Sequence, residues 1–288
     1  MSLINIDLSG LSEPGVKLIE KLSDAVGAIY KPTGIRREAK AETEADKIRL
    51  LAKMELDEIE KKAVNRLLKK ETKRQRNIEE ISMQAAKNLQ ENDKVNDIDE
   101  DWLTVFFNEC QDISESEIQS LWAKILSEEV KNKGSISKRA IRFISSIDRA
   151  EAELITKFGK YVWDTHSKTP ILYSSETNAN ELYGLTFDEL HQLESLGIIL
   201  QNLGYSLTFS SKSGIIHYYG IPLIINFEST NPKEWTIGTG TAILTPLGVQ
   251  ILKLSGSQPD LEYLAKVIAE INKLDNITAG IAFPQQQN

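Results

Sequence analysis

Basic side chains gather in one short stretch of the chain, where they could bind phosphate groups. Residues 61–76 hold eight Lys and Arg against one acid, Glu71, whereas residues 91–129 hold twelve acids against Lys94 and Lys124. The eight bases are Lys61, Lys62, Arg66, Lys69, Lys70, Lys73, Arg74 and Arg76. One interpretation is that the two blocks dock on each other, within one chain or across two. The other is a phosphate or nucleic-acid track.

The candidate contacts of such a track lie in the second half of the basic block: Lys69, Lys70, Lys73 and Arg74. No aromatic residue is interleaved among these bases, so nucleotide bases would find nothing to stack on. The formal net charge of -8 repels a duplex at long range. We therefore expect only weak, non-specific binding that salt abolishes.

A second basic group lies at the start of a predicted helix. Its members are Lys131, Lys133, Lys138, Arg139 and Arg142. The free backbone N–H groups of residues 135–139 could receive an anion beside Lys138, Arg139 and Arg142. Ser137 accounts for the helix start without a ligand, so capping is the simpler interpretation.

Residues of the types used in catalysis and metal binding are scattered. His166, His191 and His217 lack the spacing of a metal site. No glycine loop for phosphates and no nucleophile-elbow motif occurs. Cys110 follows two Phe, which favours a buried structural thiol over a nucleophile. We therefore expect no enzymatic activity, no metal and no cofactor.

The N-terminal third of the chain is predicted to be helical. An amphipathic helix is expected in residues 1–34, because apolar side chains recur every three or four positions from residue 14 to residue 30. Residues 35–91 contain neither Gly nor Pro and predict one long charged helix, or a helix broken once, about 85 Å if unbroken. A helix of that length must bury its apolar stripe against another helix, as in a coiled coil. The sequence thus predicts a homo-oligomer.

Residues 92–168 are predicted to form a compact helical module. Ser114 and Glu117 have the spacing of a capping box at the start of one helix. A later helix is expected from Arg149 to about Trp163. The predicted core consists of large apolar residues at helical spacing: Trp102, Phe106, Leu121, Trp122 and Ile125.

Residues 169–288 are predicted to form short strands and turns. We expect a hairpin around residues 210–214, a helix beginning at Pro246, and a last ordered element over residues 261–274. Helix, strand pair and terminal helix together resemble a winged-helix domain. Between residues 170 and 252 two bases stand against seven acids, which favours contacts with protein over DNA.

The predicted fold class is therefore α+β and mainly helical: a long N-terminal helix, a compact helical module and a winged-helix-like α/β domain. A hydrophobic content of 41% suffices for a buried core. The single cysteine, the polar N-terminus and the lack of an apolar run of about 20 residues predict a cytoplasmic protein.

Several segments resemble an uncharacterised bacterial family related to abortive-infection alpha-type proteins. They include LSEPGVKLIEKLSDAVGAIY, then DEDWLTVFF, then LWAKIL followed by GSISKR, and finally LESLGIIL with LTPLGVQIL. The resemblance implies a bacterial or prophage-encoded protein connected with defence against phage. It supplies no catalytic residue.

Three functions follow as hypotheses. The first is a non-enzymatic, abortive-infection-type defence protein, an oligomeric scaffold or sensor that binds a phage or host protein. The second is a nucleic-acid-binding module that uses residues 61–76 and 131–142. The third is a membrane-associating effector that rests on a membrane surface through residues 14–30, although packing of this helix on the long helix is the simpler use.

Overall fold

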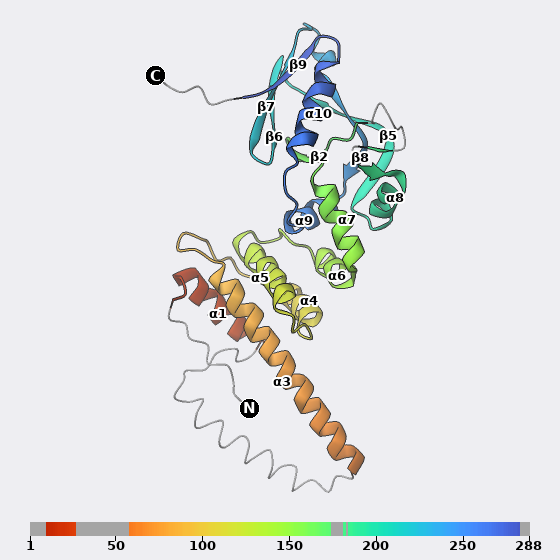
Figure 1. Ribbon diagram of the computed structural model, residues 1–288. Coiled ribbons are helices and arrows are strands. Elements are labelled where there is room, and N and C mark those ends of the chain that lie inside the picture. The colour runs from red at the N-terminus through yellow and green to blue at the C-terminus, as the bar shows by residue number, and fades with distance from the viewer. Residues whose placement is uncertain (1–9, 27–57, 174–180, 183, 283–288) are drawn as a thin grey trace. The chain divides into compact units, whose positions relative to one another are not determined.

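A computed structural model describes residues 10–26, 58–173, 181–182 and 184–282 (Figure 1). The chain divides into two compact units, residues 1–145 and 146–288. The first unit is helical, and the strands that the structure describes all lie in the second unit. The α+β, mainly helical class predicted from the sequence is confirmed.

The first unit is an assembly of α-helices. They are α1 (Glu13–Val26), α3 (Glu58–Lys87), α4 (Glu100–Cys110), α5 (Ser116–Lys131) and α6 (Lys138–Ser146), the last of which ends at the unit boundary. Of the predicted long helix, the described part is α3; residues 35–57 lie outside the described residues.

Helix α1 packs on α3 as the sequence predicts. Its apolar side chains Leu18, Ile19 and Leu22 are buried, and the Ser12 hydroxyl just before it donates a hydrogen bond of 2.7 Å to the carbonyl oxygen that follows α3 at Leu89. A Cβ on Gly15 would lie 2.7 Å from the Ala86 carbonyl oxygen, so only glycine permits this close approach. Burial of an apolar face is the main source of helix stability here.

The core between α4 and α5 is aromatic. The rings of Trp102 and Phe106 stack with centroids 5.1 Å apart, and Trp122 meets Phe106 edge-on at 5.4 Å. The Trp102 indole N–H donates a hydrogen bond of 2.7 Å to the Ile136 carbonyl oxygen. Together with Ile125, these predicted core residues are all buried.

Two details of this module differ from the predictions. Leu121 is only half-buried, because it lies at the edge of the α5 face that Trp122 and Ile125 bury. The predicted capping box at Ser114 is wrong: α5 begins after Glu115, without a side-chain cap, and the Ser114 hydroxyl instead donates a hydrogen bond of 3.2 Å to Asn77 Oδ1 on α3.

The second unit combines helices with antiparallel sheets. Its helices are α7 (Arg149–Gly159), α8 (Phe187–Ser195), the 3-10 turn η1 (Pro232–Glu234), α9 (Pro246–Leu254) and α10 (Leu261–Asn272). Its strands are β1 (Val162–Asp164), β2 (Lys168–Pro170), β3 (Glu181–Leu182), β4 (Leu185–Thr186), β5 (Ile199–Thr208), β6 (Ser213–Tyr218), β7 (Ile221–Phe227), β8 (Thr236–Leu244) and β9 (Ile277–Ile281).

The strands form one five-stranded sheet, in the order β2-β1-β6-β7-β9, and the two-stranded sheets β5-β8 and β3-β4. The predicted hairpin at residues 210–214 is wrong, because this stretch joins β5 and β6, which belong to different sheets. The hairpin lies at Tyr219 and Gly220, whose φ angles of 47° and 82° are those of a tight two-residue turn. A winged-helix arrangement is not confirmed.

The unit boundary and two element ends also differ from the predictions. Helix α7 packs on α8 and α9, so it belongs to the second unit and not to the module predicted over residues 92–168. It ends at Gly159, and Trp163 lies in β1. The chain continues beyond the predicted last helix into β9, which pairs with β7. The helix predicted from Pro246 is confirmed as α9.

Buried tyrosines tie α10 to the five-stranded sheet. Tyr263 Oη on α10 accepts a hydrogen bond of 2.8 Å from the Trp163 indole and donates one of 2.7 Å to the Ile171 carbonyl oxygen. Tyr218 Oη donates to the Lys160 carbonyl oxygen at 2.8 Å, and burial raises the pKa of Tyr218 to about 12. These hydroxyls are structural, because each is held by buried backbone groups.

Candidate functional site

The first half of α3, residues 58–76, is the most exposed helical segment of the first unit. Leu67 is 58% exposed, whereas Ile81, farther along the same helix, is 0% exposed. Figure 1 shows this half of α3 running beyond α4 and α5, while the second half lies beside α1 and α5. The segment is thus open to a partner on the sides that the described residues of this unit leave uncovered.

Five of the bases predicted from the sequence form a stripe along this half of α3. The members of the basic stripe are Lys62, Arg66, Lys69, Lys73 and Arg76, all of them exposed. They are spaced by four, three, four and three residues, so that at 3.6 residues per turn they fall on one face. No acid lies on this face between the first and the last of them.

The basic stripe points away from the side of α3 that is packed. The buried apolar residues of the second half, Ile78, Ile81 and Ala85, lie on a face roughly opposite to that of the stripe, at about 100° per residue. The stripe is therefore on the solvent side of the helix and does not face α1 or α5.

Arg74 stands apart from the stripe because it is bound inside the unit. Its Nε lies 2.8 Å from Asp112 Oδ1 and its Nη2 lies 2.7 Å from Asp112 Oδ2, and Nη1 lies 3.0 Å from Glu71 Oε1. The hydrogen bonds from Arg74 lower the pKa of the Asp112 carboxyl below its usual range. Arg74 is therefore a structural residue and not a ligand contact.

The other bases of the block do not dock on the acidic block. Among the described residues, no carboxylate pairs with Lys69, Lys70 or Lys73, or with the remaining stripe residues. The predicted docking of the two blocks is thus realised at Arg74 and Asp112 within one chain. Lys70 is exposed beside the stripe.

Four acids of the acidic block pair with bases from elsewhere in the unit. Lys131 Nζ lies 3.2 Å from Asp93, and Lys138 Nζ lies 3.2 Å from Asp99 and 3.6 Å from Asp101. Lys21 on α1 pairs with another acid of the block, Asp97. These four acids are thus engaged by lysines outside the basic stripe.

The anion position predicted near Ser135 is filled by the chain's own carboxylate. Glu129, which is 4% exposed, accepts hydrogen bonds from the backbone N–H groups of Gly134 at 2.6 Å and Ile136 at 2.9 Å. Ser137 Oγ accepts the N–H of Ala140 at 3.1 Å, which confirms its predicted capping role. Arg139 and Arg142 are exposed on α6, on a different element from the basic stripe.

The role of Glu129 as acceptor for the loop N–H groups was not predicted from the sequence. The only signal is an acid in the last turn of a helix, where the helix dipole disfavours it, followed by a glycine. The φ angle of +85° at Gly134 turns the backbone N–H groups of the loop back toward that carboxylate.

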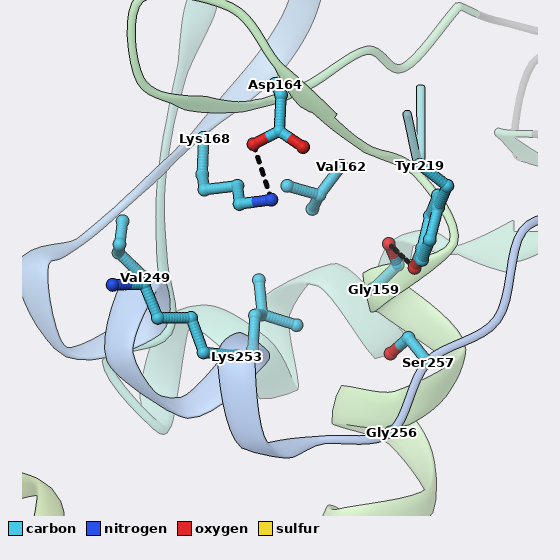
Figure 2. Close-up of a pocket in the computed structure, with 10 residues that line it drawn as sticks. Gly159, Val162, Asp164, Lys168, Tyr219, Val249, Lys253, Gly256 and Ser257 are labelled. Atoms are coloured by element: carbon cyan, nitrogen blue, oxygen red, sulfur yellow. Dashed lines mark hydrogen bonds and ion pairs between the residues drawn. The ribbon is translucent and has the colours of Figure 1, made fainter. Parts of the chain in front are cut away.

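The second unit has a cavity of about 340 Å³ near the end of α7 (Figure 2). Val162 and Val249 give it apolar walls, and Figure 2 shows Asp164 and Lys168 on one side and Lys253 on the other. A cavity of this size could hold a small ligand.

The polar groups of this cavity are largely engaged with the protein. Lys168 Nζ lies 2.5 Å from Asp164 Oδ1, Tyr219 Oη donates to the Gly159 carbonyl oxygen at 3.0 Å, and Ser257 Oγ donates to a backbone carbonyl of α7 at 2.8 Å. Among the described residues that line the cavity, no hydrogen bond joins a nucleophile to a general base. These bonds tie the turn after β6 and the segment after α9 to α7, and β2 to β1.

Other reactive side chains have structural surroundings. Cys110 is buried, as predicted, and burial raises the pKa of its thiol well above the usual range. Within the described part of the chain, no cluster of three or more His, Cys, Asp or Glu side chains could hold a metal ion. No helix among the described residues is both long enough and apolar enough to cross a bilayer.

These features define an α+β protein of two units whose first unit carries an exposed, basic helical segment. The chain belongs to the family described as protein of unknown function DUF2806, which matches residues 61–268. The match begins at the basic block and ends in α10, so it covers parts of both units. No curated protein and no solved structure matches the chain. The family match does not connect the chain to abortive-infection proteins.

Proposed function

We propose that this protein is a non-enzymatic component of bacterial anti-phage defence, of the abortive-infection type, that acts as an oligomeric scaffold or sensor. In this proposal α3 joins copies of the chain, and the second unit contacts a phage or host protein. The observation that carries the proposal is the exposed first half of α3, a helical segment without a packing partner among the described residues of its own unit.

The apolar side of this segment favours a second copy as its partner. Val64 lies 14 residues before Ile78, and Leu67 lies 14 residues before Ile81, so half-buried Val64 and exposed Leu67 continue the line that α3 buries in its second half. Short helices are marginal in water unless an apolar face is packed. A second α3 segment would supply that packing.

The charge distribution is compatible with such pairing. The basic stripe lies on the face of α3 opposite to Leu67, so two copies joined through their apolar sides would hold their stripes apart. Like charges would then face solvent and not each other.

The defence assignment is supported by the sequence segments that resemble abortive-infection alpha-type proteins. The non-enzymatic assignment is supported by the cavity of the second unit, whose hydroxyl groups are bonded to backbone carbonyls. The membrane alternative is less favoured, because it requires α1 to withdraw Leu18, Ile19 and Leu22 from the interior of the first unit.

Light scattering tests the assembly. We expect the wild-type protein at micromolar concentration to have a mass that is a multiple of 32.3 kDa. Leu67→Glu should reduce that mass to 32.3 kDa with folding intact. A matched control is Leu261→Glu, which makes the same change at a residue that is 64% exposed on α10 and should leave the mass unchanged. A monomeric wild-type protein would overturn the proposal.

Plaque counts test the defence role. Cells that express the wild-type protein should give at least tenfold fewer plaques with a susceptible phage, and Leu67→Glu should restore the count whereas Leu67→Met should not. An assembled protein that leaves plaque counts unchanged across a broad set of phages would refute the defence assignment while leaving the scaffold intact.

A further inference from the structure

The basic stripe on α3 has the geometry of a surface for a regularly charged polymer. From Lys62 to Arg76 it runs for about 21 Å along the helix, at 1.5 Å per residue, with a base at nearly every turn of about 5.4 Å. The side chains are exposed, and no acid interrupts their face. We propose that this stripe binds the phosphate backbone of duplex nucleic acid.

The partner of the stripe must come from outside the described part of the first unit. Three acids of the acidic block, Asp93, Asp97 and Asp99, are paired with lysines of α5, α1 and α6. Arg74, the base that does reach an acid of this block, lies off the stripe. Five positive charges therefore remain on one solvent-facing line without an ion pair among the described residues, where an anionic partner could bind them.

The composition of the stripe favours phosphates over an acidic protein. A stable protein interface has an apolar core surrounded by a polar rim, and the stripe contains only Lys and Arg. Exposed ion pairs between proteins contribute little on their own. Binding to a polyphosphate needs no apolar core, because each neutralised phosphate releases condensed counterions.

The absence of aromatic residues also bears on the kind of nucleic acid. Single strands are held largely by stacking of bases on aromatic rings, and the basic block contains none. A duplex presents two phosphate chains without exposing base faces, which matches a stripe of cations alone. The binding is backbone binding without sequence preference.

The salt dependence of binding follows from the number of phosphate contacts. Five phosphate contacts give a slope of about −4.5 for the logarithm of affinity against the logarithm of salt concentration. Affinity should therefore fall roughly 500-fold between about 50 and about 200 mM salt. The overall charge of -8 keeps the binding weak even at low salt.

This inference does not depend on the proposed assembly, since the stripe and the apolar line of Val64 and Leu67 lie on different faces. The monomeric variant Leu67→Glu should therefore still bind, with the same salt slope per chain. Loss of assembly and loss of nucleic-acid binding are in this way separate results.

The test is fluorescence anisotropy with a labelled duplex and a labelled single strand of equal length, over about 50 to 200 mM salt. The test variant changes four stripe residues to Gln: Lys62, Arg66, Lys69 and Lys73. The control variant makes the same charge change at four exposed bases outside both basic groups: Lys94, Lys124, Lys212 and Lys233. Thermal unfolding establishes that both variants are folded.

We expect the stripe variant to lose about four units of salt slope and the control to bind as the wild type does. Equal loss in both variants, or loss in the control alone, would overturn the proposal. Tighter binding of the single strand would also contradict it. Competition by poly-glutamate as strong as that by the duplex would assign the stripe to an acidic protein surface instead.

Discussion

The two halves of α3 have the same helical backbone but opposite surroundings. In the second half Ile78, Ile81 and Ala85 are buried against the first unit. In the first half Leu67 is exposed, and five bases line the solvent face. Helix propensity and apolar periodicity therefore extend along all of α3. Burial of its apolar side chains depends instead on how far α1, α4 and α5 extend beside it.

The same comparison separates structural from functional charge. Arg74 lies where the two halves meet and is fixed by Asp112. The stripe residues toward the N-terminal end have no such partner among the described residues. Arg74, at the end of the first half, stabilises the fold, whereas the stripe residues of the same half are the ones that we propose for binding.

The largest expected effect is on the packing that holds the second half. Trp122→Ala removes a buried ring of α5 that meets Phe106 edge-on. Loss of a buried aromatic of this size costs about 3 to 5 kcal/mol. Urea unfolding of the full chain should show this loss in the transition of the first unit. An unchanged midpoint would mean that Trp122 is not part of the core.

A direct contrast between the halves comes from two truncations in the same helix. Ile81→Ala should destabilise the first unit by about 2 to 5 kcal/mol, because it leaves a cavity in a fully buried site. Leu67→Ala, measured under dilute conditions, should change stability by no more than about 0.5 kcal/mol. Equal losses of unfolding free energy in the two variants would contradict the difference in packing between the two halves.

A smaller effect is expected at Asn77, the first buried residue of the second half. Its Nδ2 donates to the Gln111 carbonyl oxygen at 2.8 Å, and its Oδ1 accepts from Ser114 at 3.2 Å and Gln119 at 3.3 Å. Asn77→Ala leaves these groups without a hydrogen-bond partner and should lower the free energy of unfolding by about 1 to 3 kcal/mol. The control Asn65→Ala, at an exposed position of the first half, should be nearly neutral in thermal unfolding.

The smallest effect concerns pH and the ion pair at the junction. The pKa of Asp112 is lowered in the folded state by Arg74, so its contribution to stability is present above the unfolded pKa of about 3.9. It is lost as pH falls through the lower folded-state pKa. A double-mutant cycle with Arg74→Gln and Asp112→Asn should show coupling at pH 7 that weakens as the pH is lowered below about 3.9. Coupling that persists in acid would contradict this assignment.

Helices and the core could be predicted where the pattern is local. The spacing of apolar residues predicts α1, α4, α5 and α9, and the aromatic residues of the core follow from size and period. Ser137 is predicted as a cap because its hydrogen bond is made three residues away. These features depend on neighbours in the sequence.

Features that depend on distant residues could not be predicted. The Ser114 hydroxyl caps no helix because Asn77, on another helix, accepts from it. Likewise β6 pairs with β7 and β1 and not with β5. The hairpin is therefore the β6–β7 turn at Tyr219 and Gly220, and not the predicted turn at residues 210–214. In the candidate site, the basic composition was visible, but which bases are paired depends on the distant position of Asp112.

Hydrogen exchange along α3 tests the central claim most directly. Deuterium uptake of peptides from the two halves is compared at submicromolar and at high protein concentration. We predict that the second half is protected at both concentrations, and that the first half exchanges rapidly in dilute solution and becomes protected on assembly, except in Leu67→Glu. Equal protection of both halves in the dilute protein would contradict the claim that the first half of α3 becomes packed only when a second copy of the chain binds.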